Sequence, residues 1–413
     1  MELSSRVKGM AESVTLKLNT KAMELSDSGK QIYNLTAGQL PFRPPQSFID
    51  AIRTELDFLK SYQYSPVAGF HDLRKKIMEH IQETRGINFA SLDIPFDCVI
   101  SNGAKHSISN ILGAIIDPGD EVIIIAPYWI SYPEMIKFCR GIPIVVSSSI
   151  FDVFSPSIQE IRKAISEKTK AIIINSPNNP AGIHYSDEWM QEFADLLVEF
   201  PHVNVISDEI YFEVCYYDPK PTYFYQKNPE LLKRTIIVDG ISKAFASTGL
   251  RIGYAIGPQN ICKGIENLQG QLTSSANSLI QRAMINYDFA ESSQFLIPVK
   301  NHLRDNANVI KEKLKEAHLM KCWYQPVSAF YFMIDFSQTP VFEKYSNTRK
   351  DKTDYSVLIC EDILEELGVV IVPGTDFGMI NSARLSLVLH KEAFSEAMDK
   401  LVQFLNEGGP KLT

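Results

Sequence analysis

Residues that could carry out chemistry stand directly after short apolar runs in this sequence. Asp208 and Tyr211 follow one such run, and Lys243 follows the next, with Arg251 a little further along. A lysine amine can bond covalently to a carbonyl carbon, a carboxylate can stabilise a protonated ring nitrogen, and a guanidinium can bind phosphate or carboxylate. An earlier run is followed at once by residues 101–105, where small residues begin a predicted helix. The N–H groups at such a helix start are a natural seat for phosphate.

Aromatic and amide side chains follow two further runs. Trp129 comes after the run at 122–126, and Asn179 comes after the run at 171–175. The sequence contains neither a dinucleotide-binding glycine fingerprint nor a P-loop. A phosphate seat, an aromatic plate, an acid, a tyrosine and a lysine together are what pyridoxal phosphate chemistry requires. In that chemistry a lysine forms the Schiff base and a carboxylate keeps the ring nitrogen protonated. The set therefore predicts a pyridoxal phosphate site.

Short apolar runs and the helical patterns between them must position these residues. The runs are rich in β-branched residues, which suits strands buried on both faces of a sheet. Residues 187–200 show helical spacing of apolar residues behind Ser186, a plausible helix cap. The alternation predicts an α/β fold in which helices sandwich a mostly parallel sheet, with ligands at the carboxyl ends of the strands. The predicted strands lie at 98–100, 122–126, 142–146, 171–175, 203–207, 236–239 and 252–256.

The last part of the chain has a different pattern, which predicts a smaller α+β domain. A long charged helix is expected at 299–317 and a closing helix at 391–405, and strands are expected at 329–334, 369–372 and 384–388. The first 45 residues hold few strand signals. We therefore expect an N-terminal arm with part of the small domain at 1–45, a large cofactor-binding domain at 46–290, and a small C-terminal domain at 291–413.

Composition limits the class of protein. The 413 residues include 41 Lys and Arg against 49 Asp and Glu, for a net charge of −8, with 45% hydrophobic residues. This is a globular composition without the basic balance of a nucleic-acid binder. The longest strong apolar runs are strand-sized, so no membrane span is expected. The N-terminus does not resemble a secretory signal and the six cysteines show no zinc-site spacing, so we expect a cytoplasmic protein without a metal site.

The ordered set of motifs closely resembles the class I aminotransferases of the fold-type I pyridoxal-phosphate enzymes, and among them the bacterial aspartate aminotransferase subgroup. The resemblance runs nearly end to end, from residues 3–7 through 35–38 and 242–251 to 384–386. It implies a large domain with a mostly parallel sheet sandwiched by helices and a smaller α+β domain. It also implies a ping-pong aminotransferase for L-aspartate and 2-oxoglutarate.

The resemblance implies a role for each matching residue at the cofactor. Lys243 would form the Schiff base and move the substrate proton, and Asp208 would pair with the ring nitrogen. Tyr211 and Asn179 would bind the phenolic oxygen, and Tyr64 would reach the phosphate in a second subunit, which implies a homodimer with shared active sites. The catalytic residues would be Lys243, Asp208 and Tyr211, and the full cofactor-binding set would be Gly103, Ala104, Lys105, Trp129, Asn179, Asp208, Tyr211, Lys243, Arg251 and Tyr64.

A second group of matching residues would bind the amino acid and the 2-oxo acid. Arg384 would hold the α-carboxylate, which a guanidinium fork does best. A lysine at a helix start is disfavoured by the helix dipole unless an anion lies beside it, and Lys105 matches the lysine that pairs with a side-chain carboxylate. Gly38, Trp129 and Asn179 complete the predicted substrate-binding set. The resemblance therefore predicts a dicarboxylic amino donor.

Some positions depart from the family's pattern and leave alternatives open. Gln39 and Leu40 replace a Glu-Pro pair near the substrate, and Leu250 replaces a tryptophan. An aminotransferase of aromatic, alanine-type or other specificity is therefore an alternative, and a pyridoxal-phosphate β-lyase or a non-enzymatic sensor is a more distant one. Ala11 and Glu12 stand where many relatives carry a basic residue linked to prephenate, which argues against that substrate.

Each residue also has an ordinary structural explanation when it is considered alone. Asp208 could cap a helix, Trp129 could pack in the core, and Tyr64 could pack at a subunit face. Only the ordered set favours the catalytic interpretation.

Overall fold

The chain is built around one large and one small β-sheet. The computed structural model describes residues 1–10, 14–349 and 352–407. Within these residues the large sheet has seven strands, and of these β8 alone runs antiparallel to its neighbours. The strands in order across the sheet are β2 (Phe96–Ser101), β8 (Gly253–Pro258), β7 (Thr235–Gly240), β6 (Asn204–Asp208), β5 (Thr169–Asn175), β3 (Glu121–Ile125) and β4 (Ile142–Val146).

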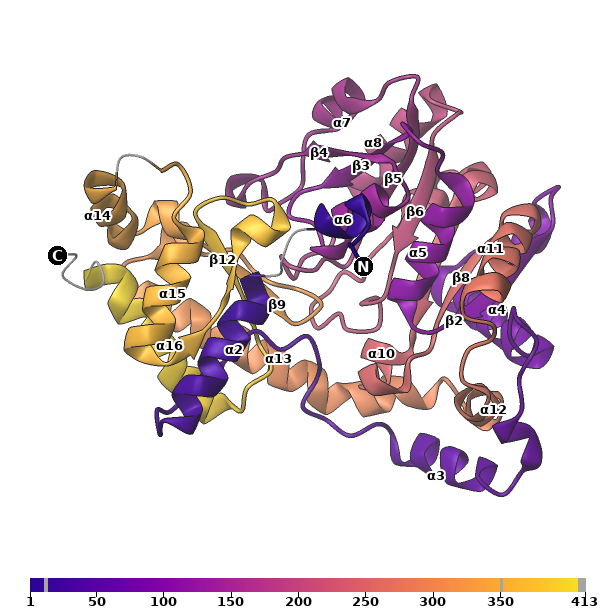
Figure 1. The fold of residues 1–413 in the computed structure, drawn as a ribbon, viewed down its shortest axis with the longest axis horizontal. Helices are drawn as coiled ribbons and strands as arrows, with labels where there is room; N and C mark the ends of the chain where they lie inside the picture. The colour runs from indigo at the N-terminus through magenta and orange to yellow at the C-terminus, as the bar shows by residue number, and fades with distance from the viewer. Residues whose placement is uncertain (11–13, 350–351, 408–413) are drawn as a thin grey trace.

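Helices cover both faces of the large sheet because successive strand residues are apolar on both sides (Figure 1). In β3, Ile123 and Ile125 belong to one buried cluster, whereas Val122 and Ile124 belong to another on the opposite face. The first cluster includes residues of α4 (His71–Arg85), α7 (Ile158–Ala164) and α8 (Asp187–Glu199). The second includes residues of α5 (Ala104–Ile115), α6 (Ser131–Phe138) and α11 (Gln259–Leu272). The predicted α/β sandwich is therefore confirmed.

The small sheet lies in a second group of elements, at the left of Figure 1. Strand β12 (Ser382–Ser386) pairs antiparallel with both β9 (Tyr331–Asp335) and β11 (Val372–Pro373). A short parallel pair, β1 (Tyr33–Asn34) with β10 (Val369–Val370), joins the N-terminal segment to this group. The helices of the group are α2 (Val14–Asp27), α13 (Glu291–Glu316), α14 (Pro340–Thr348), α15 (Ser356–Leu367) and α16 (Lys391–Glu407). The domain boundaries at 45 and 290 stay a prediction.

Two expectations about this part of the chain were wrong in detail. The single strand predicted at 369–372 is two strands, β10 and β11, which pair with different partners. The helix predicted to begin at 299 begins at Glu291 and passes through Pro298. Apolar patterning reports burial rather than pairing partner, and a proline normally ends a helix. The helix predicted at 187–200 is α8, whose cap Ser186 accepts a hydrogen bond from Trp189 N as expected.

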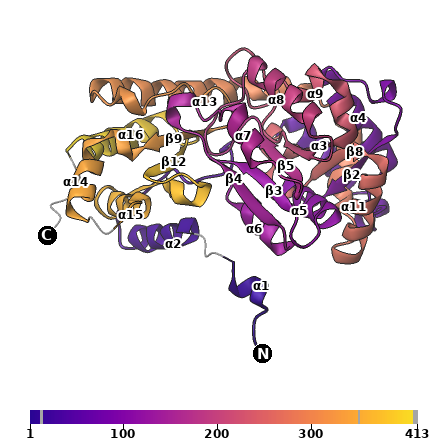
Figure 2. The same ribbon diagram turned by 90° about the horizontal axis from the view of Figure 1, so that it is seen from above.

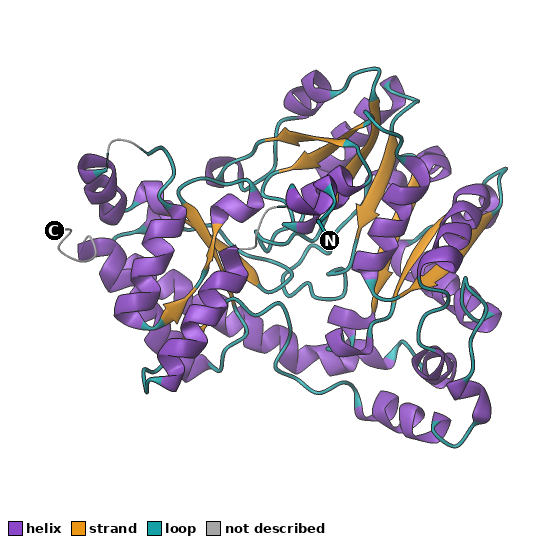
Figure 3. Cartoon of the chain, viewed as in Figure 1, coloured by secondary structure: helices purple, strands orange, loops and turns teal. Residues whose placement is uncertain are grey.

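Figure 3 shows the helices in purple around the orange strands. They include α3 (Gln46–Glu55), α9 (Phe224–Lys227), α10 (Ile241–Ala244) and α12 (Ser278–Asn286). Helix α1 (Ser5–Lys8) lies apart from the body of the molecule in Figure 2. Residues 11 and 12, which bear on prephenate, lie outside the described residues. Across the described ranges, none of the helices has the length and apolar character that a membrane crossing needs.

Candidate active site

The carboxyl ends of the parallel strands and the start of β8 meet at one edge of the large sheet. Because β8 is antiparallel, its first residue, Gly253, pairs with Ser101 at the end of β2 and with Gly240 at the end of β7. A Cβ atom at Gly253 would lie 2.1 Å from the amide nitrogen of Ala104. Only glycine permits this approach, which brings the start of α5 against the sheet edge. The sheet thus gathers several chain segments at one place.

A cavity of about 320 Å³ opens at this edge, and its walls contain ten of the twelve residues predicted from the sequence. These ten are Gly38, Ala104, Lys105, Trp129, Asn179, Asp208, Tyr211, Lys243, Arg251 and Arg384. Gly103 lies just behind the wall, where a Cβ atom would be 2.6 Å from Nη2 of Arg251. Tyr64 is not in the wall: it is 90% exposed and borders a separate hollow with Asn102 and residues 275–278. The roles of all twelve residues stay predictions.

Asp208 ends β6 as a buried carboxylate with two hydrogen bonds. Its Oδ2 accepts a hydrogen bond from the hydroxyl of Tyr132 at 2.5 Å, and its Oδ1 accepts one from Ile210 N at 3.3 Å. Burial raises the pKa of Asp208 to about 6, although both hydrogen bonds and the charge of Lys243 oppose that rise. A cationic N–H donor beside this carboxylate would therefore stabilise its charged form and lower its pKa.

Lys243 lies on α10, directly after β7, and its Nζ donates a hydrogen bond to the carbonyl oxygen of Gly38 at 2.5 Å. Burial, together with the charges of Arg384 and Arg251, lowers the pKa of Lys243 to about 8, although the charge of Asp208 opposes this shift. A lysine with this pKa has a substantial neutral fraction near pH 8. A neutral amine is the nucleophilic form and can also accept a proton.

The start of α5 and the side chain of Arg251 form a concentration of N–H donors. The amides of Ala104 and Lys105 donate to no acceptor within the described ranges, because they belong to the first turn of the helix. Arg251 donates to the carbonyl oxygens of Thr248 at 3.0 Å and Asn102 at 3.2 Å, which fixes its guanidinium beside that turn. Two orphan amides, a helix dipole and a cation suit a phosphate group.

Arg384 on β12 and Lys105 on α5 bring two more cations to the cavity. Arg384 donates to Oδ1 of Asn179 at 3.1 Å and to the carbonyl oxygen of Thr36 at 2.9 Å. Its buried Nε has no acceptor among the residues that the structure describes. Lys105 lies 5.1 Å from the ring of Trp129, and burial lowers its pKa. Both side chains can therefore still accept an anionic partner.

Two tyrosines at the site were not identified from the sequence. Tyr331, at the start of β9, lines the cavity, and its hydroxyl lies 3.3 Å from that of Tyr211. Tyr132 on α6 hydrogen-bonds Asp208 from outside the cavity wall. Ser242 of α10, to which no role was given, also lines the cavity. The family motif that contains Tyr211 could have pointed to a second hydroxyl, but nothing in the sequence around Tyr132 or Tyr331 names its partner.

Comparison with known proteins decides the family. Residues 30–401 match the model of the family described as aminotransferase class I and II. The chain belongs to this family. The predicted resemblance to class I aminotransferases is thereby confirmed, and the enzyme is a pyridoxal-phosphate-dependent aminotransferase.

Individual relatives align with this chain over nearly its full length. A probable aspartate/prephenate aminotransferase of Thermus aquaticus is 33% identical over 98% of this chain and 99% of its own length. The aspartate aminotransferase of Bacillus subtilis is also 33% identical, over 98% of this chain and 100% of its own. The solved structure of the aspartate aminotransferase of Thermus thermophilus with maleate has a TM-score of 0.86 at 33% identity and covers 98% of this chain and 100% of its own. The predicted similarity to bacterial aspartate aminotransferases is confirmed.

The cavity of this aminotransferase fits the family's cofactor. The donor-rich helix start matches a phosphate, and the close approach of Gly103 to Arg251 leaves no room for a side chain in that cradle. The raised pKa of Asp208 is typical of a buried carboxylate that lacks a cationic partner, and the protonated ring nitrogen of the cofactor would be such a partner. Lys243, in the wall of the same cavity, supplies an amine. The residues present are thus those that pyridoxal phosphate needs.

Proposed function

We propose that this aminotransferase exchanges the amino group between L-aspartate and 2-oxoglutarate by a ping-pong mechanism. The observation that carries the proposal is the pair of cations in one cavity, Arg384 with its orphan Nε and Lys105 without a carboxylate partner in the part of the chain that the structure describes. A dicarboxylate would satisfy both cations. The maleate in the Thermus thermophilus structure is a dicarboxylate, which supports the same substrate class.

The cavity residues would hold the cofactor in a defined orientation. We propose that Asp208 pairs with the ring nitrogen and that Trp129 stacks on the ring. Tyr211 and Asn179 would hydrogen-bond the phenolic oxygen. The backbone of residues 103–105, together with Arg251, would hold the phosphate, and the unpaired amides of Ala104 and Lys105 support this. When bound, pyridoxal phosphate supplies a carbonyl carbon that reacts with amines and a ring that accepts electrons.

Lys243 would hold the cofactor covalently and then move a proton. Its Nζ, with a pKa of about 8, is neutral often enough to act as a nucleophile and as a base near that pH. Once the amino acid has displaced it, Nζ can accept the α-proton and release it again. Arg384 orients the α-carboxylate meanwhile, and Gly38 brings backbone close to Lys243. The first 2-oxo acid leaves before the second one binds.

We also propose a homodimer in which Tyr64 completes the partner's site. Tyr64 is 90% exposed, and Leu59 and Tyr62, which precede it closely in the sequence, are 72% and 66% exposed. A large exposed apolar patch commonly marks a protein interface. A cytoplasmic location is proposed with it, because the six cysteines, all within the described residues, are unpaired thiols.

A half-reaction tests the proposed function. The protein loaded with pyridoxal phosphate is mixed with one amino acid at a time, without any 2-oxo acid, and the shift of the cofactor's absorption band is followed. We expect the fastest conversion with aspartate or glutamate. Faster conversion with tyrosine, phenylalanine or alanine would contradict the dicarboxylate proposal and support the other specificities. Release of ammonia without an acceptor would instead support a β-lyase.

A further inference from the structure

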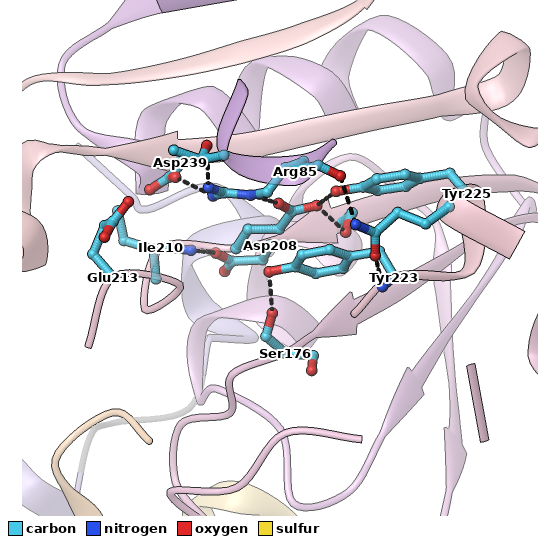
Figure 4. A network of polar contacts seen from close by, with 12 residues as sticks. Arg85, Ser176, Asp208, Ile210, Glu213, Tyr223, Tyr225 and Asp239 are labelled. Carbon is cyan, nitrogen blue, oxygen red and sulfur yellow. Dashed lines mark hydrogen bonds and ion pairs between the residues drawn. The ribbon is translucent and has the colours of Figure 1, made fainter. Parts of the chain in front are cut away.

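A fully buried arginine lies behind the cavity and joins the ends of two strands (Figure 4). Arg85, the last residue of α4, donates from Nε to Oε2 of Glu209 and from Nη2 to Oδ2 of Asp239, both at 2.8 Å. Glu209 directly follows β6, and Asp239 lies near the end of β7. Arg85 is not part of the cavity wall, so it does not touch the proposed reactants.

The two carboxylates belong to the segments that carry the central functional groups. Glu209 is the residue after Asp208, and Asp239 is the second-last residue of β7, which leads directly into the helix α10 that carries Lys243. The guanidinium of Arg85 therefore links a side chain of the segment that carries Asp208 to a side chain of the segment that leads to Lys243. A planar guanidinium fork with two bound carboxylates holds them at a fixed separation, which a flexible ammonium does not.

Other contacts fix each end of this bridge. Oε1 of Glu209 accepts hydrogen bonds from Ser207 Oγ and the Tyr225 hydroxyl, each at 2.8 Å. The guanidinium carbon of Arg85 lies 3.4 Å from the ring centroid of Phe212. Glu209 N donates to the carbonyl oxygen of Val238 at 2.8 Å, so the backbone also links the two segments there. The bridge is thus ordered at both ends.

Burial of three charged groups is not the cheapest way to fill this space. A well-packed apolar set of similar volume is often as stable as a buried ionic triad. Burial raises the pKa of Asp239 to about 7 even though Arg85 opposes the rise. The ion triad of Arg85, Glu209 and Asp239 therefore gains little stability from its charges. Its hydrogen bonds are better explained by a need to fix the positions of the two strand ends.

We propose that Arg85 is a positioning residue that sets the separation between Asp208 and Lys243. The inference rests on the proposed function, because it gives those two residues their roles. A displacement of about 1 Å at a catalytic group can cost roughly a hundredfold in rate. Arg85 acts through the two strand ends and makes no contact with the reacting atoms.

The test compares Arg85→Lys with a matched control on the same helix. Arg74, also on α4, pairs with Asp97 on β2 and donates to the carbonyl oxygen of Cys98, and none of these three residues lines the cavity. Both variant holoenzymes are measured for bound pyridoxal phosphate, for the circular dichroism of the cofactor band, and for kcat and KM. For Arg85→Lys we expect kcat per bound cofactor to fall roughly tenfold or more, with KM little changed and a weaker dichroism band. Arg74→Lys should leave all three at wild-type values.

A second pair of variants decides the question if Arg85→Lys does not fold. Asp239→Leu removes the link to β7 and leaves the ion pair between Arg85 and Glu209 balanced, whereas Asp239→Asn keeps an acceptor for Nη2 of Arg85. We expect the leucine variant to lose kcat and dichroism and the asparagine variant to keep most of both. Wild-type kcat and dichroism in the leucine variant would overturn the inference. Failure of the wild-type protein to convert any amino acid would instead count against the proposed function.

Discussion

Removal of the Tyr132 hydroxyl should raise the pKa of Asp208. The hydroxyl donates a 2.5 Å hydrogen bond to Oδ2, and both side chains are buried. A hydrogen bond to a charged group contributes about 1.5–3 kcal/mol, and each pKa unit corresponds to about 1.4 kcal/mol. Tyr132→Phe should therefore raise the pKa of Asp208 by about 1–2 units. The wild-type value is about 6.

Cofactor binding by the apoenzyme reports this pKa. If Asp208 must be a carboxylate to pair with the ring nitrogen, affinity for pyridoxal phosphate falls as the pH drops through its pKa. We expect the acid limb of the binding profile to lie near pH 6 in the wild type. In Tyr132→Phe it should lie about 1–2 units higher. The free cofactor titrates in the same way in both experiments, so a difference between the two binding profiles arises from the protein.

A matched variant separates this effect from a general loss of stability. Tyr324 is also buried, and its hydroxyl donates to the carbonyl oxygen of Ala181 at 2.6 Å rather than to a carboxylate. Tyr324→Phe should lower the free energy of unfolding but leave the binding profile unchanged. Coincident profiles for Tyr132→Phe and the wild type would refute the reasoning, because the hydrogen bond would then contribute nothing to the charge state of Asp208.

Three other predictions concern the cations and the buried acid. Lys243→Ala should abolish turnover while pyridoxal phosphate stays bound without a covalent bond, as absorbance and gel filtration would show; retained turnover would contradict its role. Lys105→Ala should raise KM for aspartate roughly tenfold or more but leave KM for alanine nearly unchanged, because only aspartate offers a second carboxylate; equal changes would remove the case for aspartate. The apoenzyme should lose about 3 kcal/mol of stability from Asp208 as the pH rises from about 4 to about 6. The folded state keeps the Asp208 proton to higher pH than the unfolded state does. The difference in unfolding free energy between the wild type and Asp208→Asn, measured at each pH, isolates this loss, and a difference that does not change with pH would contradict it.

The sequence predicted the cavity well because the functional residues follow apolar runs. A buried parallel strand has a recognisable composition, and its carboxyl end has a fixed place in the fold, so Asp208 and Lys243 could be located without any contact information. Arg251 was located in the same way, because it follows the same apolar run as Lys243; the strand after it turned out to be antiparallel. The motif order then supplied the family.

Contacts between distant segments could not be predicted in this way. Tyr132 and Tyr331 come from a surface helix of the large sheet and from a strand of the small one, and their place beside Asp208 and Tyr211 depends on packing. Arg85 ends an amphipathic helix, where a basic residue is ordinary, and its burial depends on two carboxylates far along the chain. The division of 369–372 into two strands likewise depends on which partner each residue meets.

The reversed direction of β8 has a consequence for tolerance to insertion. Because β8 starts where β7 ends, the chain carries Lys243 and Arg251 on one connection that never leaves the sheet edge. A parallel strand in that place would require a crossover helix on the sheet face between them. Extra residues between β3 and β4 can extend outward from α6, whereas extra residues at 241–252 would lengthen the one connection that carries Lys243 and Arg251 and so change the separation of these two cavity residues. A library of random insertions should therefore recover active clones in the first connection and none in the second.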